Sequence, residues 1–201
     1  TDFAPKTALV IGAEGEGLRK RTKEHCDVLA RIPGGRPGIE SLNAGVAATV
    51  ALAEVVRDAT QLQKRACADA RLALELNLPG DALVVRGDGR RLGQLLDNLI
   101  ANARRYTDAP GRIRITLTGT DDCVRLAIDD TPPGVPEASL PMLFERLYRV
   151  DNSRARNSGG AGLGLAICRA IVAAHGGTIR AKASQPGGLC ILIDLPPATA
   201  N

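Results

Sequence analysis

Aromatic residues are almost absent from this chain. Its 201 residues include two Tyr, two Phe and no Trp, so any core must be built from aliphatic side chains. No apolar run approaches the roughly 18 residues that span a membrane, and no signal peptide is evident. The five cysteines form no CxxC pair, which argues against a zinc site and a disulfide framework. We therefore expect a cytoplasmic globular protein with reduced thiols and no membrane segment in this chain.

A large excess of one charge is also lacking. Lys and Arg number 26 against 22 Asp and Glu, for a net charge of +4. The basic residues are scattered, except for one concentration between residues 146 and 156. This distribution weakly favours an anionic ligand and does not require nucleic acid, so no nucleic-acid partner is expected.

Glycine, by contrast, is plentiful, and four glycines crowd into residues 159–164 directly before an apolar helix that ends at Gly176 and Gly177. A glycine-rich loop that leads into a helix N-terminus offers free N–H groups to an anion, most often a phosphate. A flexible loop before a core helix explains the glycines equally well. Helical spacing predicts that one face of the helix is buried, formed by Leu163, Ile167, Ala170, Ile171 and Ala174.

A second long helix is predicted over residues 89–106, with Asp88 as its N-cap. Its core stripe is Leu92, Leu96, Leu99 and Ala103, and a polar face carries Gln94, Asn98, Asn102 and Arg105. A solvated face and a buried amide network are two structural explanations for these polar residues. The functional explanation is that an Asn oxygen reaches Mg²⁺ while Arg105 meets phosphate oxygens.

Six strands are predicted around these helices, and they are 71–76, 83–86, 112–118, 123–129, 178–183 and 189–195. The last two form a hairpin, as do 112–118 and 123–129. Asp130 follows a strand directly and precedes a Pro/Gly turn, so it sits at the rim of a sheet. It can accept a hydrogen bond from an exocyclic amine such as that of adenine, or it can merely open the turn. A short helix carrying Phe144 comes next, before the arginine-rich segment.

Four of these segments together resemble the catalytic and ATP-binding domain of sensor histidine kinases, a member of the Bergerat (GHKL) fold group. L-L-D-N-L-I-A-N-A-R-R-Y-T (95–107) is similar to the N box and D-D-T-P-P-G-V-P (129–136) to the first glycine box. L-F-E-R-L-Y-R (143–149) is similar to the F box and G-G-A-G-L-G-L-A-I (159–167) to the second glycine box. The order and spacing of the four boxes make the resemblance specific over residues 52–197.

The resemblance implies roles for individual residues. Asn98, Asn102 and Arg105 would be the catalytic residues that meet phosphate and Mg²⁺, with Asn102 as the metal ligand. Asp130 would read the adenine amine. The other residues expected to contact ATP are Tyr106, Gly134, Phe144, Arg149, Arg154, Gly160, Gly162, Leu163 and Gly164, those from the arginine-rich run onward forming the ATP lid. Pro132 replaces the first glycine of the usual D-x-G-x-G pattern, which stiffens this turn.

The N-terminal quarter carries a different pattern, with strands predicted over 7–12 and 28–32 and a helix from Ser41 to about Ala53. A-L-V-I-G-A-E-G-E-G-L (8–18), E-H-C-D (24–27) and I-P-G-G-R-P-G-I-E-S-L-N-A-G-V-A-A-T-V-A-L (32–52) resemble the C-terminal part of TrmH-type SPOUT RNA methyltransferases. The resemblance implies S-adenosylmethionine contacts at Gly12, Glu14, Gly15, Ile32, Ser41, Leu42 and Asn43. The family's N-terminal half is missing, which favours a scaffold role for this fragment.

We therefore predict a two-layer α/β sandwich of the Bergerat type over residues 57–201, preceded by a short βαβα segment over 1–56, with a junction inside one continuous helix. The expected function is an ATP·Mg²⁺-binding kinase module that transfers the γ-phosphate to a histidine on a separate dimerisation domain. A response regulator is the further partner, and a homodimer stays open. The alternatives are a methyltransferase fragment and a chimeric, non-enzymatic scaffold. Neither His25 nor His175 has the sequence context of a phosphoacceptor, and the dipole at its helix end would favour a charged His175.

Overall fold

The computed structural model describes residues 48–80, 83–120, 122–150 and 162–198. Everything predicted for residues 1–47 lies outside this range, including the two N-terminal strands and His25.

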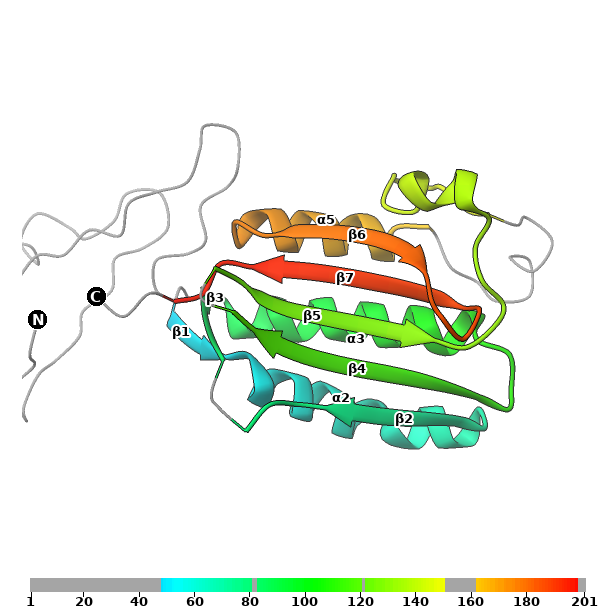
Figure 1. Ribbon diagram of the computed structural model, residues 1–201, viewed down its shortest axis with the longest axis horizontal. Helices are drawn as coiled ribbons and strands as arrows, with labels where there is room; N and C mark the ends of the chain where they lie inside the picture. The colour runs from blue at the N-terminus through cyan, green and yellow to red at the C-terminus, as the bar shows by residue number, and fades with distance from the viewer. Residues whose placement is uncertain (1–47, 81–82, 121, 151–161, 199–201) are drawn as a thin grey trace, which may run out of the picture.

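The described chain forms two layers (Figure 1). One layer is a five-stranded sheet with the order β2-β4-β5-β7-β6, in which β2 and β4 are parallel and the other neighbours are antiparallel. The helices α2, α3 and α5 cover one face of this sheet. This arrangement confirms the predicted α/β sandwich. The elements are β1 (Ala48–Ala51), α2 (Leu52–Asp69), β2 (Leu72–Asn77), β3 (Val84–Gly87), α3 (Gly89–Tyr106), β4 (Gly111–Gly119), β5 (Val124–Asp130), the 3₁₀ helix η1 (Glu137–Met142), α5 (Gly164–Ala174), β6 (Thr178–Ala183) and β7 (Leu189–Leu195).

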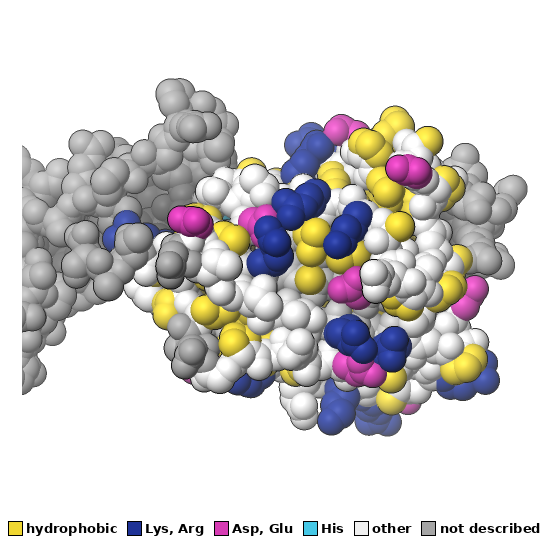
Figure 2. Space-filling view, viewed as in Figure 1, with side chains coloured by type: hydrophobic (Ala, Val, Ile, Leu, Met, Phe, Trp, Pro, Cys, Tyr) yellow, Lys and Arg dark blue, Asp and Glu magenta, His cyan; other side chains and the backbone are white. Residues whose placement is uncertain are grey.

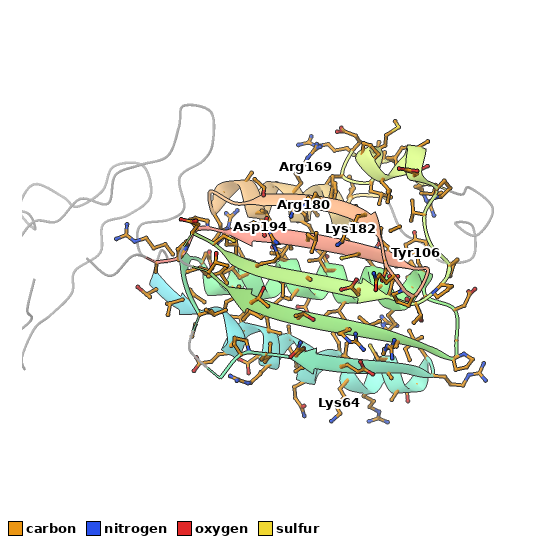
Figure 3. The ribbon with its side chains drawn as sticks, viewed as in Figure 1. Lys64, Tyr106, Arg169, Arg180, Lys182 and Asp194 are labelled. Atoms are coloured by element: carbon orange, nitrogen blue, oxygen red, sulfur yellow. The ribbon has the colours of Figure 1, made fainter. Side chains whose placement is uncertain are left out.

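The open face of the sheet is polar and carries charges of both signs (Figure 2). Asp194 on β7 lies between Arg125 of β5, at 2.6 Å, and Arg180 of β6, at 3.0 Å (Figure 3). The hydrogen bond from Arg125 lowers the pKa of the Asp194 carboxyl below its usual value. Because both arginines are about half exposed, these pairs contribute little to stability and chiefly keep this face in water.

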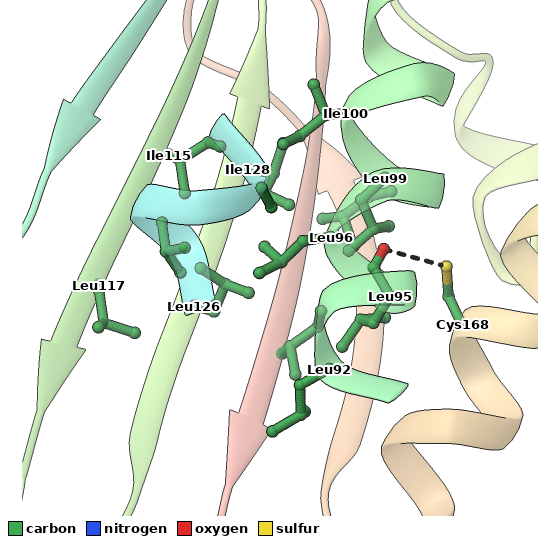
Figure 4. Packing of buried hydrophobic residues seen from close by; sticks show 14 of the residues in the cluster. Leu92, Leu95, Leu96, Leu99, Ile100, Ile115, Leu117, Leu126, Ile128 and Cys168 are labelled. Atoms are coloured by element: carbon green, nitrogen blue, oxygen red, sulfur yellow. Dashed lines mark hydrogen bonds between the residues drawn. The ribbon is translucent and has the colours of Figure 1, made fainter. Parts of the chain in front are cut away.

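The hydrophobic core lies between the sheet and α3 (Figure 4). The predicted stripe of α3 is fully buried, and Leu95 and Ile100 widen it. These side chains pack on Ile115, Leu126 and other inward-facing residues of β4 and β5, whose alternation places every second residue in the core. Asp88 caps α3 as predicted, because its carboxylate accepts hydrogen bonds from the amides of Arg90 and Arg91. The long helix is therefore fixed at its start and along its length.

The helix predicted from Ser41 to Ala53 is wrong for residues 48–51. They form β1, which pairs antiparallel with β3, and α2 begins only at Leu52. The backbone of β3 supplies the hydrogen-bond partners for β1. This pairing overrides the helical tendency of the two alanines in β1. Consequently, no continuous helix runs through residues 48–57, and the predicted boundary between residues 56 and 57 falls inside α2.

The buried face predicted for α5 is also wrong in part. Leu163 and Ile167 are 41% and 39% exposed, whereas the helix buries Cys168, Ile171 and Val172. Because α5 is apolar on nearly all sides, helical spacing could not tell its core face from its other face. The short helix expected to carry Phe144 is η1, and it ends at Met142, two residues earlier.

None of the described helices is both long and apolar enough to cross a membrane. The four cysteines in the described part of the chain, Cys67, Cys123, Cys168 and Cys190, are free thiols. Burial raises the pKa of the Cys168 and Cys190 thiols to about 12, so these two are protonated and unreactive at neutral pH.

Candidate nucleotide-binding site

A cavity of about 650 Å³ opens beside the C-terminal half of α3, where β5 ends and α5 begins. Ten of the thirteen site residues predicted from the sequence line it, and they are Asn98, Asn102, Arg105, Tyr106, Asp130, Gly134, Arg149, Gly162, Leu163 and Gly164. Arg154 and Gly160 lie outside the described residues. Residues from four separate segments of the chain therefore meet in one hollow, as the four motifs predict.

The α3 wall of the cavity is polar because this helix turns its leucine stripe to the sheet. Asn98 and Asn102 lie one helical turn apart on the opposite side, and Arg105 and Tyr106 follow at the end of the helix. The Nδ2 atom of Asn98 is buried and has no hydrogen-bond partner among the described residues. An unpaired amide in a cavity wall is costly unless a ligand satisfies it. Gln94, predicted on the same face, does not line the cavity.

Asp130 forms the end of the cavity at the sheet. Only 7% of this residue is exposed, and its Oδ1 accepts a hydrogen bond of 2.6 Å from the Leu189 amide. Asp130 also lines the cavity, so its carboxylate can accept a further hydrogen bond from a ligand. Burial raises the pKa of the Asp130 carboxyl to about 6, although the Leu189 bond opposes this rise. A buried carboxylate in a cavity is a typical binding group.

The loop after Asp130 is packed tightly against the turn between β6 and β7. A Cβ atom on Gly134 would lie 2.8 Å from the backbone oxygen of Gly187, so only glycine fits there. Pro132 does not line the cavity; its carbonyl oxygen accepts the Asp108 amide at 3.0 Å. Pro132, which replaces the usual glycine, therefore packs behind the cavity and does not line it.

Phe144 has a different role from the one expected. It is 6% exposed, belongs to the core cluster and is not among the cavity residues. Its neighbours Leu143 and Tyr148 line the cavity instead. Phe144 thus fixes the segment 143–149 to the hydrophobic core, while Leu143 and Tyr148 of the same segment line the cavity.

Arg149 and the start of α5 also line the cavity. The Nη2 atom of Arg149 is buried and, like Asn98 Nδ2, has no partner among the described residues. The Leu147 amide donates to the Gly162 oxygen at 3.0 Å, and Glu145 forms a 2.7 Å ion pair with Arg169 of α5. These contacts hold residues 145–147 against Gly162 and α5, and Gly164, the first residue of this helix, lines the cavity.

Sequence reasoning missed the apolar part of the lining. It comprises Ala101, Pro133, Val135, Pro136, Leu143, Tyr148, Val150, Leu165, Ile167 and Leu189. Eight of these residues lie within the four quoted motifs and Val150 follows one directly, so membership of a motif was a usable signal. Leu189 was not detectable, because only the pairing of β7 with β5 brings it to Asp130.

His175 lies outside the site and ties two helices together. Its Nε2 accepts the Asp88 amide at 3.0 Å, and its Nδ1 lies 2.8 Å from the Ile171 oxygen. Both ring nitrogens of His175 are therefore used within the fold. Its 5% exposure and these two bonds leave no nitrogen for a phosphoryl group.

Comparison with known families identifies the class to which this fold and cavity belong. The family described as histidine kinase-, DNA gyrase B- and HSP90-like ATPase matches residues 87–199, which is more than half of the chain. The chain therefore belongs to this family. A second family, the SpoU rRNA methylases, matches residues 1–53. The seven cofactor positions expected from that likeness all lie outside the described residues.

The more particular relatives are sensor kinases. Escherichia coli BaeS, a signal transduction histidine-protein kinase, is 50% identical over 62% of this chain and 27% of its own length. TcrY of Mycobacterium tuberculosis, a probable sensor histidine kinase, is 40% identical over 92% of this chain and 37% of its own. This chain thus spans between about a quarter and two fifths of these relatives. The TcrY match also overlaps most of the segment matched by the SpoU family.

Solved structures agree with this assignment. The mycobacterial sensor histidine kinase MprB is 30% identical with a TM-score of 0.65, covering 76% of this chain and 98% of that one. The catalytic domain of histidine kinase ThkA is 26% identical with a TM-score of 0.67, covering 75% and 95%. The described part of this chain is a catalytic domain of the sensor histidine kinase type.

Proposed function

We propose that this chain binds ATP·Mg²⁺ in the cavity beside α3 and transfers the γ-phosphate to a histidine of a separate dimerisation domain. The observation that carries the proposal is the set of groups that line this one cavity. It combines the buried carboxylate of Asp130 with the unpaired Asn98 amide and Arg149 guanidinium. Adenine supplies a donor for the carboxylate, and a triphosphate supplies acceptors for the amide and the guanidinium.

At the base end, the Asp130 carboxylate accepts a hydrogen bond from the exocyclic amine of adenine. Leu143, Ile167 and other apolar residues of the lining cover the flat faces of the base. Guanine presents a carbonyl where adenine presents its amine, and this carbonyl would face the carboxylate unpaired. The site therefore selects adenine through the penalty of an unsatisfied buried acceptor.

At the phosphate end, Asn98, Arg105 and Arg149 supply donors, and the first turn of α5 adds its free amides and positive dipole end. The residues present also fit Mg²⁺. No group of three His, Cys, Asp or Glu that could hold a metal occurs among the described residues. Amide oxygens of Asn102 and Asn98 are the ligands offered, which suits an ion that shares the remaining positions with phosphates and water. When bound, Mg²⁺ would neutralise charge on the transferring phosphate.

The chain's own residues then contribute position and charge. Asp130 fixes the base, while Arg105 and Arg149 hold the phosphate oxygens so that the γ-phosphate faces an incoming imidazole. Both nitrogens of His175 are used within the fold, so among the described residues no histidine is available as acceptor, and we infer that the acceptor belongs to another domain or another molecule. Such a domain uses ATP, so we place it in the cytoplasm.

Two related structures support the partners of this scheme. One is ShkA in complex with AMPPNP, 28% identical with a TM-score of 0.66, and the other is ThkA in complex with the response regulator TrrA, 25% identical with a TM-score of 0.65. We infer an adenine nucleotide and a response regulator as partners of this chain by analogy. Dimerisation would follow from pairing through the domain that carries the acceptor histidine.

Calorimetric titration of the full chain with AMPPNP and Mg²⁺ tests the proposal. Asp130→Ala should weaken binding by roughly tenfold to a hundredfold, since it removes a charged hydrogen-bond partner worth ~1.5–3 kcal/mol. Asp129→Ala is the matched control, because this neighbouring carboxylate points to the other face and bonds Ser184. Asn102→Ala should weaken binding mainly when Mg²⁺ is present. An unchanged dissociation constant in Asp130→Ala would refute the site.

The methyltransferase alternative has one observation in its favour, the SpoU match over residues 1–53. About fifty residues bury too little apolar surface to form a cofactor fold alone. We therefore assign this segment a scaffold role. Transfer of label from S-adenosylmethionine to RNA by the full chain would contradict that assignment.

A further inference from the structure

The turn between β6 and β7 lies outside the four sequence motifs but packs against the cavity, and Leu189, which directly follows it, is one of the lining residues. It contains Gly187 and Gly188 and leads into Leu189, the first residue of β7. The turn is 55 or more residues from Asp130 along the chain, yet the pairing of β5 with β7 places it against the loop that follows Asp130.

The first observation is the bond from the turn to the carboxylate. The Leu189 amide donates to Oδ1 of Asp130 at 2.6 Å, in a buried setting. A charge-assisted bond of this length fixes the carboxylate in one rotamer. This bond takes up one acceptor site of Oδ1 and leaves the rest of the carboxylate for a ligand. The Leu189 side chain also lines the cavity.

The second observation is the space that the turn leaves. A Cβ atom on Gly188 would overlap with both the backbone oxygen and Oδ1 of Asp130. Gly187 has a φ of +91°, and a Cβ there would lie 3.2 Å from Cγ of Pro132. The backbone of the turn therefore approaches Asp130 more closely than any residue with a side chain would allow.

We propose that the turn Gly187–Leu189 is a positioning element of the nucleotide site, which holds the Asp130 carboxylate in the orientation that meets the adenine amine. Gly188 provides the clearance, and the Leu189 amide provides the anchor. This inference rests on the proposed function. It adds residues that determine base selectivity without belonging to the four motifs.

The experiment compares Gly188→Ala with the matched control Gly80→Ala in the full chain. No atom lies within 4 Å of a Cβ on Gly80, so that substitution should be silent. Titration with ADP and with GDP, each with Mg²⁺, gives affinity and base selectivity. We expect Gly188→Ala to bind ADP at least about tenfold more weakly, with a lower ADP-to-GDP preference, because the carboxylate loses its fixed orientation.

A second variant removes the anchor without adding bulk. Replacing the peptide bond between Gly188 and Leu189 by an ester deletes the N–H donor alone, and its position near the C-terminus makes semisynthesis practical. The carboxyl resonance of Asp130, followed by ¹³C NMR against pH, should show a pKa above the wild-type value of about 6, since the Leu189 bond lowers it. A merely structural role would change the melting temperature and leave this pKa and the base preference unmoved.

The outcomes are distinct. A wild-type chain that does not bind ADP refutes the proposed function and this inference with it. Wild-type binding that persists unchanged in the ester variant, with an unchanged Asp130 pKa, refutes the inference alone. Weaker ADP binding with a raised pKa in the ester variant supports it, even if Gly188→Ala does not fold.

Discussion

Asp130 should make the protein less stable as pH rises, and Asp130→Asn should abolish this effect. Burial raises the carboxyl pKa from 3.8 to about 6 in the folded chain, while the unfolded chain keeps the ordinary value. Below pH ~4 the group is protonated in both states and contributes nothing. Between pH ~4 and ~6 the unfolded chain releases its proton first, so the free energy of unfolding falls by about 2–3 kcal/mol and then levels off.

Urea unfolding at pH values from 4 to 8 measures this effect as a difference between wild type and Asp130→Asn. As pH rises, the free energy of unfolding of the Asn variant should increase relative to that of the wild type. A constant difference in this free energy, caused by the weaker bond from Leu189 to the Asn side chain, is added at every pH. Asp194 has the opposite sign, because its pKa is lowered by Arg125 and its contribution is lost on acidification. It is present in both proteins and cancels. A difference that stays flat between pH 4 and 7 would refute the assigned environment of Asp130.

The remaining predictions concern the scaffold and the acceptor. Gly87→Ala should lower the melting temperature by several degrees, because the added Cβ would overlap with Cδ2 of His175. Gly93→Ala in α3 should raise the melting temperature, because its Cβ meets nothing within 4 Å and alanine favours a helix. Equal shifts in the two variants would contradict the close packing of Gly87 against His175. The chain incubated alone with labelled ATP should acquire no acid-labile phosphate, since His175 is buried and bonded at both nitrogens, and label on His175 or His25 would show otherwise. With labelled S-adenosylmethionine, bulk RNA should stay unlabelled.

The parts of the fold that the sequence predicted correctly are those with local signals. Asp88 followed by a leucine stripe defines α3 to the residue, because a cap and a periodic face are encoded within one stretch of chain. The hairpin of β6 and β7 has the bounds expected from its alternation and its Gly-Gly turn. In these elements, neighbouring residues decide the structure, so one sequence was sufficient.

The errors arose where a distant segment decides the structure. Residues 48–51 look helical by themselves and become a strand because β3, more than 30 residues later, offers them an edge. In α5, both sides of the helix are apolar. The side carrying Cys168 meets α3, and the side carrying Leu163 and Ile167 is left for the cavity. The spacing of apolar residues cannot distinguish a helix face that packs in the core from one that lines a ligand cavity, because both faces are apolar.

The same reasoning explains which site residues were predictable. Asn98, Asn102 and Asp130 stand out because an amide or carboxylate in an apolar frame needs a partner, whether or not the partner is in the chain. In the structure, the Nδ2 atom of Asn98 has no partner among the described residues, and burial raises the pKa of the Asp130 carboxyl to about 6. Both costs are borne by the folded protein before any ligand arrives. Because both groups line the same cavity, we infer that one ligand relieves both costs, and the proposed nucleotide would do so by donating to Asp130 and accepting from Asn98.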